Sequence, residues 1–265
     1  MPRATTPARR RASPRTRPSA AAFRETDAER RRRALRIVRK LAAAYPDARC
    51  ALDYRTPFQL LVATILSAQC TDKKVNEVTP ALFARWPTPE ALAAAPPAEV
   101  EAMIRPTGFY RQKARAIQSS ARDIVERFGG RVPNTMEELL SLHGVARKTA
   151  NVVLGNAFGV PGLTVDTHMK RVNARLGLTR EEDPVKIERD LMELIPQREW
   201  TIYSHRVIHH GRVCCIAQRP RCEACPLAAD CPWPRTHAGV RGVAPARKAA
   251  AGDAARSAAR RSPRS

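Results

Sequence analysis

Three of the predicted helices begin with the same signal, a small polar residue followed directly by proline. It occurs at Thr56–Pro57, Thr88–Pro89 and Asp183–Pro184. The polar side chain can accept a hydrogen bond from the first turn of a helix, and proline fits the first helical position because it needs no N–H partner there. Sustained alternation of apolar and polar residues is absent, so the chain is predicted to be all-α.

Apolar residues recur at helical spacing throughout the central part of the chain. In the segment 56–69 they fall at i, i+3, i+4, i+7 and i+8, and Gln59 is expected to complete a capping box with Thr56. Similar spacing predicts helices within 29–46, 113–130 and 183–196, and Gly129 is expected to end the second of these. We expect about ten short helices and no internal repeat.

The formal net charge of +22 is spread over three parts of the chain. Residues 1–24 contain seven arginines and no acidic residue, and residues 235–265 contain eight Lys or Arg and one Asp, so the segment between keeps a charge of +8. Both tails contain few large apolar residues, cannot bury enough surface to offset the entropy of ordering, and are expected to be disordered. A basic central segment typically neutralises nucleic-acid phosphates.

The sequence contains no run of about 18 apolar residues, so no segment is expected to span a membrane. The first residues lack the apolar stretch of a secretory signal, and they also lack the apolar stripe of an organellar transit peptide. We therefore expect a cytoplasmic protein whose cysteines are reduced or bind metal.

Four of the seven cysteines form a close series with the spacing C-x6-C-x2-C-x5-C: Cys215, Cys222, Cys225 and Cys231. Four thiolates this close can surround one metal centre, either zinc or a [4Fe–4S] cluster. Zinc ribbons usually pair two CxxC motifs, whereas a single CxxC flanked by single cysteines favours the cluster. Cys214 is expected to face away from the ligands beside it, and Cys50 and Cys70 are expected to be ordinary buried residues.

A turn at 143–146 leads directly into a predicted helix at 147–157. Gly144 permits a tight turn, and the unpaired N–H groups at the start of the helix can bind a phosphate. This segment resembles a helix–hairpin–helix motif, which usually reads Gly-Val-Gly; here Ala146 replaces the second glycine, which a helical backbone angle would tolerate. Lys148 lies in the first turn, where the helix dipole disfavours a positive charge. Asp166 occupies the predicted N-cap position of a later helix.

The hairpin with its lysine, the Val165-Asp166-Thr167-His168 motif and the cysteine series together resemble the endonuclease III family, bacterial DNA glycosylase/AP lyases of the helix–hairpin–helix superfamily. The resemblance runs from about residue 30 to residue 234 and includes segments 60–76 and 106–114. It implies two helical domains with a DNA cleft between them. Residues 25–49 and 162–234 would form the iron–sulfur domain, and residues 50–161 a helical barrel that contains the hairpin.

The resemblance also implies the chemistry and the cofactor. Lys148 would attack C1′ of a damaged nucleotide, displace the base and form a Schiff base that permits β-elimination of the strand. Because an ordinary lysine amine is protonated at neutral pH, attack requires surroundings that favour the neutral amine, such as a helix N-terminus. Asp166 would assist deprotonation and stabilise positive charge on the sugar. The four cysteines would hold a [4Fe–4S] cluster.

By the same resemblance, several residues are expected to contact duplex DNA that carries damaged bases or abasic sites. They are Gln69, Phe109, His143, Gly144, Ala146, Arg147, Thr149, His168, Arg219 and Arg221. Gln69 and Phe109 would enter the gap left by an extruded base, Gln69 facing its orphaned partner. An aliphatic residue is usual at the position of Phe109, but either kind of apolar side chain can act as a wedge.

Two other functions remain open at this point. An adenine-specific glycosylase of the same superfamily would lack the lysine, carry a glutamate near Thr64 and have a further C-terminal domain. A non-catalytic DNA-binding or redox protein could use the same scaffold, but it would need neither Lys148 nor Asp166. We therefore expect a monomeric, nucleoid-associated bacterial enzyme of base excision repair that removes oxidised pyrimidines.

Overall fold

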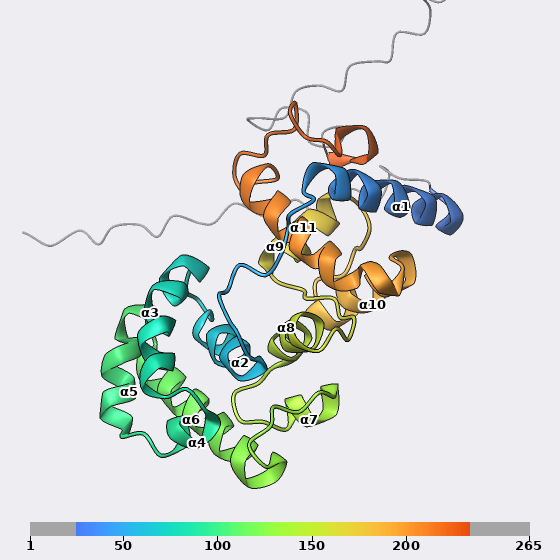
Figure 1. Ribbon diagram of the computed structural model, residues 1–265. Helices are drawn as coiled ribbons and strands as arrows, with labels where there is room; N and C mark the ends of the chain where they lie inside the picture. Colours follow the sequence, from blue (N-terminus) through green and yellow to red (C-terminus); the bar gives the residue numbers. More distant parts are fainter. Residues whose placement is uncertain (1–24, 234–265) are drawn as a thin grey trace, which may run out of the picture.

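The computed structural model of the protein describes residues 25–233 and contains helices but no strand within that range (Figure 1). This confirms the predicted all-α fold. The α-helices are α1 (Asp27–Ala44), α2 (Pro57–Leu66), α3 (Asp72–Arg85), α4 (Pro89–Ala93), α5 (Pro97–Ile104), α6 (Tyr110–Phe128), α7 (Met136–Leu140), α8 (Arg147–Ala157), α9 (Thr167–Arg175), α10 (Pro184–Leu194) and α11 (Trp200–Val213). Short 3-10 turns are η2 (Arg105–Thr107), η3 (Gln197–Glu199) and η4 (Ala228–Asp230). The tails expected to be disordered, 1–24 and 235–265, lie outside the described residues.

The three predicted helix starts are confirmed. The side chains of Thr56, Thr88 and Asp183 accept hydrogen bonds from the first turns of α2, α4 and α10, and each is followed by proline at the first helical position. The capping box predicted for α2 is wrong in one respect. The side-chain oxygen of Gln59 accepts from the N–H of Arg55 at 2.8 Å instead of returning to Thr56.

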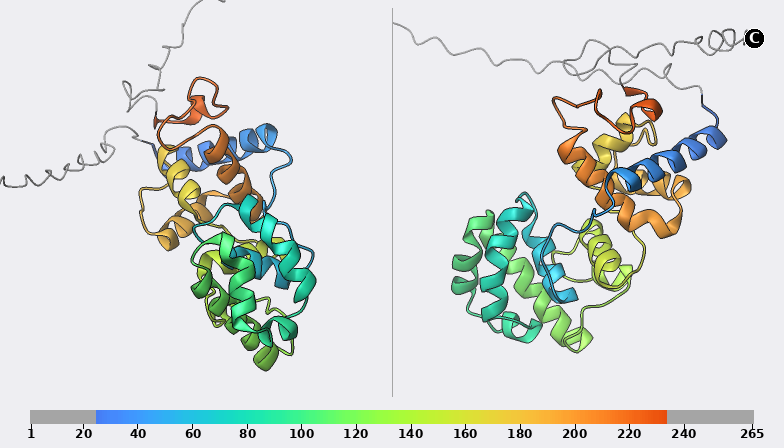
Figure 2. Two further views of the ribbon diagram at one scale, coloured as in Figure 1. Left: turned by 90° about the vertical axis from the view of Figure 1, so that its left-hand side faces the viewer. Right: turned by 45° about the horizontal axis from the view of Figure 1, so that its top comes forward.

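The helices are arranged in two lobes (Figures 1 and 2), and the buried apolar residues form one core in each lobe. In the first lobe, α2 lies against α3, α6 and α8, and eight of its ten residues are buried. A helix that is apolar on all sides is a core helix, and the others surround it. The buried residues of this core lie between Leu52 and Leu154.

The second core joins the start of the described chain to its end. Helix α1 packs against α10, α11 and η4, and this core draws on residues 34–41 and 163–227. The chain leaves α1, crosses to the first lobe at α2 and returns after α8 (Figure 1). On α1 the most buried apolar side chains include Ala34 and Ile37, whereas Leu35 and Ala42 are only partly buried.

In the described part of the chain, every helix is too short or too polar to cross a membrane.

A buried arginine fastens α1 to the second lobe. Arg33 is 3% exposed, and its guanidinium binds both carboxylate oxygens of Glu25 at 2.7 and 2.8 Å. The same group donates to the backbone carbonyls of Leu176, Gly177 and Asp230. Backbone carbonyls at the end of α9 are therefore satisfied by a cation from a helix more than 140 residues earlier.

Replacing Arg33 with methionine is expected to lower the free energy of unfolding by about 3–5 kcal/mol, because Glu25 and three carbonyls lose their partner in a buried site. Urea unfolding measures this change. Arg32→Met, which alters an exposed position on the same helix, is the control and should stay within about 0.5 kcal/mol of the native chain. Equal stability of the two variants would contradict the proposed role of Arg33.

Candidate active site and DNA interface

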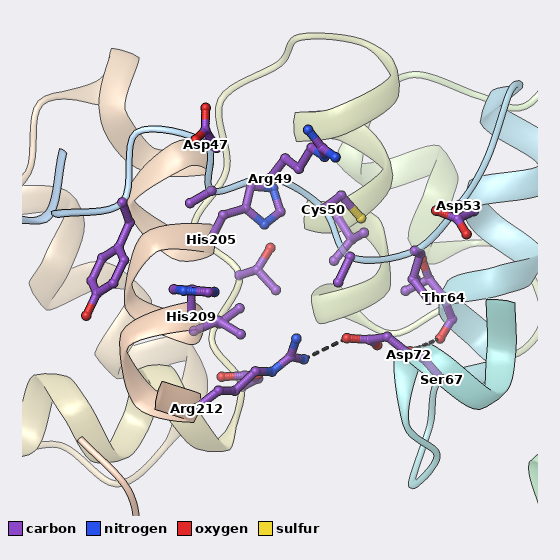
Figure 3. Close-up of a pocket in the computed structure, with 18 of the residues that line it drawn as sticks. Asp47, Arg49, Cys50, Asp53, Thr64, Ser67, Asp72, His205, His209 and Arg212 are labelled. Atoms are coloured by element: carbon purple, nitrogen blue, oxygen red, sulfur yellow. Dashed lines mark hydrogen bonds and ion pairs between the residues drawn. The ribbon is translucent and has the colours of Figure 1, made fainter. Parts of the chain in front are cut away.

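The predicted catalytic pair lies in one cleft between the two lobes. The cleft has a volume of about 630 Å³ and is lined by Lys148 and Asp166 together with residues of both lobes. The first lobe contributes Thr64, Ser67 and Asp72, and the second contributes His205, His209 and Arg212 from α11 (Figure 3). The structure thus brings together two residues that are eighteen positions apart in sequence and belong to the starts of two helices.

The turn before Lys148 has the geometry of a tight hairpin. Gly144 has a φ of +78°, and a Cβ at this position would lie 2.8 Å from the Cβ of Ala116, so glycine is required on both counts. The N–H of His143 donates to Asp123 at 2.8 Å, and its carbonyl accepts from Ser120. These bonds hold the turn against α6.

Ala146 is accommodated for a reason that differs from the one expected. Its backbone is extended, with φ −95° and ψ 166°, rather than helical. Any L-residue can adopt these angles, so the methyl group causes no strain. Ala146 caps α8 without a side-chain hydrogen bond, which leaves the first N–H groups of the helix available to an anion.

Asp166 is the N-cap residue of α9, as predicted. Its Oδ1 accepts from the N–H of Met169 at 2.8 Å, which fixes the direction of the carboxylate. His168, two residues on, is half-buried; burial lowers its pKa, and the carboxylate of Asp166 acts in the opposite sense. Its Nδ1 lies 3.1 Å from the guanidinium of Arg171, which makes His168 an acceptor within the protein.

Of the expected DNA-contact side chains, one is paired within the protein and another is buried. The guanidinium of Arg147 binds both carboxylate oxygens of Glu188 on α10, at 2.7 and 3.0 Å, and Thr149 is only 9% exposed. Asn151 also donates to Glu188, at 3.2 Å, and to the carbonyl of Leu163 at 2.9 Å. The exposed hairpin surface consists of other expected residues, namely His143, Gly144, Ala146 and Lys148.

Gln69 and Phe109 share an unusual backbone. They are the two non-glycine residues with positive φ in the described chain, at 51° and 49°. Both are exposed, and the 61% exposure of Phe109 is the largest among the large apolar side chains of the described residues. Left-handed backbone costs a non-glycine residue about 1–2 kcal/mol. Strain of this kind concentrates at functional sites.

A buried lysine supports the loop of Phe109. Lys113 is 5% exposed, and its Nζ donates to the carbonyl of Thr107 at 2.8 Å. Burial lowers the pKa of Lys113, while the Cys70 thiol, beside Gln69 in sequence, acts in the opposite sense. The hydroxyl of Thr107 in turn donates to Ile104 at 2.8 Å. Lys113 therefore supports the strained loop of Phe109, a role that its position in a helical pattern did not indicate.

Two further contacts across the cleft were not predicted. Arg212 of α11 forms an ion pair with Asp72 of α3 at 2.7 Å (Figure 3), and His205 Nε2 lies 2.7 Å from Oδ1 of Asn156 on α8. The partners are separated by 140 and 49 residues in sequence. No local pattern could have identified them.

The four predicted metal ligands line one small cavity, together with Cys214, His210 and residues of α9. The expectation that Cys214 faces away is therefore wrong. Helix α11 ends at Val213, and the irregular backbone that follows turns both Cys214 and Cys215 toward the cavity. Burial raises the pKa of Cys225 and raises that of Cys231 to about 12. Arg175 donates to the sulfur of Cys215 at 3.3 Å.

The spacing of the sulfurs bears on what they can hold. Within residues 25–233, the one trio of metal-binding side chains whose donor atoms all lie within 4.8 Å of one another is His210, Cys214 and Cys225. No three of the four predicted cysteines meet this limit, whereas four thiolates on one zinc ion would lie about 3.8 Å apart. Their arrangement therefore fits a group larger than a single ion. Arg219 and Arg221 are exposed on the loop that leads to Cys222.

Comparison with known proteins defines the class. Residues 62–197 match the family described as HhH-GPD superfamily base excision DNA repair protein. Endonuclease III of Synechocystis sp. is 58% identical over 206 residues, covering 77% of this chain and 94% of the relative. Endonuclease III of Bacillus subtilis is 47% identical over 193 residues, covering 72% of this chain and 88% of the relative.

Solved structures agree with these relatives. A non-covalent endonuclease III–DNA complex matches with a TM-score of 0.74 and 46% identity, covering 77% of this chain and 95% of the other. A thermostable thymine-DNA glycosylase, 22% identical with a TM-score of 0.70, shares the fold. The chain therefore belongs to the HhH-GPD superfamily of base excision DNA repair proteins and, within it, to the endonuclease III family of DNA glycosylase/AP lyases.

The half-buried His205 is expected to make stability depend on pH. Burial lowers its pKa below the usual 6.5, so below about pH 6.5 the unfolded chain binds a proton that the folded chain excludes. The free energy of unfolding should then fall as the pH is lowered, by at most about 1.4 kcal/mol per pH unit for this group. Urea unfolding between pH 7 and pH 5 should show a shallower fall in His205→Gln. His143→Gln, at an exposed position, is the control; equal slopes in both variants would contradict the assignment.

Proposed function

We propose that the protein removes oxidised pyrimidines from duplex DNA and cleaves the strand at the resulting abasic site through Lys148. The observation that carries this proposal is the presence of Lys148 and Asp166 in one cleft, each at the start of a helix. A helix N-terminus offers N–H groups to a phosphate, so a nucleotide held there would present its sugar to Lys148. A relative whose structure is described as a trapped endonuclease III–DNA covalent intermediate supports the covalent route.

The reaction begins with the neutral amine of Lys148. Its nitrogen forms a bond to C1′ of the nucleotide, and the C1′–N bond to the base breaks, its electron pair leaving with the base. Loss of a proton from nitrogen and opening of the sugar ring give a Schiff base. Removal of a proton from C2′ then expels the 3′ phosphate, and water releases the lysine. The carboxylate of Asp166, whose direction the Met169 N–H fixes, is suited to accept the amine proton and to stabilise positive charge on the sugar.

Extraction of the base requires groups that fill the gap in the duplex. Gln69 and Phe109 suit this role because both are exposed and each is held in a left-handed conformation on its own loop. Phe109 supplies an apolar wedge, and Gln69 can form hydrogen bonds to the orphaned base. His143, Gly144 and Ala146 would bind the backbone phosphate without reading sequence. Arg219 and Arg221 would add phosphate contacts from the cysteine loop. The second core supports the assignment of this loop to a separate domain.

We assign a [4Fe–4S] cluster to Cys215, Cys222, Cys225 and Cys231. All four line one cavity, their sulfurs are spaced more widely than a single ion requires, and Arg175 places a positive charge beside them. When bound, the cluster would supply four iron–thiolate bonds that hold the loop of Arg219 and Arg221 in place. Thr64, whose hydroxyl donates to the carbonyl of Leu60 at 2.7 Å, provides no carboxylate of the kind expected in an adenine-specific enzyme.

Borohydride should trap a covalent adduct between the native chain and duplex DNA containing an abasic site or thymine glycol, and Lys148→Ala should abolish it. Lys73→Ala is a matched control because Lys73 is also an exposed lysine at the second position of a helix, α3. Gel electrophoresis of the denatured adduct gives the measurement. Undiminished trapping by Lys148→Ala would exclude this lysine as the nucleophile.

Lys113→Met should slow excision of thymine glycol from a paired duplex by about 10- to 100-fold, since the loop of Phe109 loses its buried anchor. Strand cleavage at a preformed abasic site should fall less, because no base has to be extruded. Gln112→Met, an exposed position on the same helix, should leave both rates unchanged. Equal losses on the two substrates would contradict a role for Lys113 in positioning the wedge.

A further inference from the structure

The proposed cluster cavity contains five thiols for four ligand positions. Cys214 is 7% exposed and lines this cavity with the four assigned ligands. Its sulfur lies within 4.8 Å of both the Cys225 sulfur and a ring nitrogen of His210. It also lies 3.6 Å from the carbonyl of Arg221, next to Cys222. Cys214 therefore faces the proposed cluster cavity and lies beside Cys225.

The backbone explains how two consecutive cysteines share one cavity. The N–H groups of Cys214 and Cys215 both donate to the carbonyl of His210, at 2.9 and 2.8 Å. The chain thus folds tightly at the end of α11 instead of alternating the two side chains. The N–H of Arg221 donates to the carbonyl of Cys214 at 2.9 Å, which ties this turn to the segment that carries Cys222.

The turn does not depend on the thiol of Cys215. Arg175 donates to the carbonyls of Cys215, Ile216 and Ala217, at 3.4, 2.8 and 2.6 Å, as well as to the sulfur of Cys215. Removing that sulfur leaves the three backbone contacts available. The segment 214–217 should therefore keep its position, and with it the sulfur of Cys214, when Cys215 is replaced.

We propose that Cys214 is a reserve ligand that binds the iron otherwise held by Cys215. In this step the Cys214 thiol loses its proton to solvent and the thiolate forms one bond to iron, with no change in oxidation state. The inference rests on the cluster assignment of the proposed function. It assigns a role to a residue that the spacing of the cysteine series leaves out.

The test compares the iron and acid-labile sulfide content and the visible absorption of five full-length proteins purified without oxygen: the native chain, Cys214→Ala, Cys215→Ala, the double variant and Cys222→Ala. The native chain and Cys214→Ala should each contain about four irons. Cys215→Ala should retain most of this iron, and the double variant should lose nearly all of it. Cys222→Ala, which removes a ligand that has no cysteine beside it in sequence, should also lose nearly all.

The outcomes separate the two proposals. If Cys215→Ala loses as much iron as the double variant, while circular dichroism shows that its helices are intact, Cys214 is not a ligand and the cluster assignment stands. If Cys215→Ala is purified unfolded, it is refolded with iron, and its iron content is compared with that of the double variant refolded in the same way. A native chain without iron would overturn the cluster assignment and the reserve ligand together.

Discussion

The geometry of the cleft depends on the hydrogen bonds that the buried carboxylate of Glu188 accepts from the other lobe. Glu188 is 4% exposed and receives hydrogen bonds from Arg147 and Asn151, both on α8, while it belongs to α10 in the other lobe. Arg147 directly precedes Lys148, and Asn151 also binds the carbonyl of Leu163, three residues before Asp166. One hydrogen-bond network therefore positions helix α8, which carries Lys148, and the loop segment that leads to Asp166. A buried charge with several partners fixes geometry more strictly than apolar packing alone.

Local chemistry made much of the fold predictable. Thr56, Thr88 and Asp183 start helices because their side chains satisfy N–H groups within three residues, and Gly129 ends α6 because it adopts φ +59°. The same reasoning located Asp166 at an N-cap and Lys148 in a first turn. Each of these statements concerns atoms that are close in sequence, where residue type alone decides which hydrogen bonds can form.

The rest of the site could not be predicted, because it depends on tertiary contacts. Nothing near Arg147 indicates that its charge is neutralised by Glu188, 41 residues later, and nothing near Asp72 indicates Arg212. The orientation of Cys214 was predicted wrongly because the expectation assumed regular alternation, whereas the two adjacent N–H groups share one acceptor. Sequence spacing specified which cysteines could serve, and the fold decided which of them face the cavity.

The burial of α2 has a consequence for how Gln69 would meet DNA. Gln69 follows helix α2, whose side chains fill the centre of the first lobe. Displacing that helix would disrupt the core. In the proposed function, the double helix would therefore have to bend and open to reach Gln69. Bending and opening cost less where base pairing is already weakened. Discrimination in favour of lesions would then begin with the mechanics of the duplex, before any chemical group of the base is recognised.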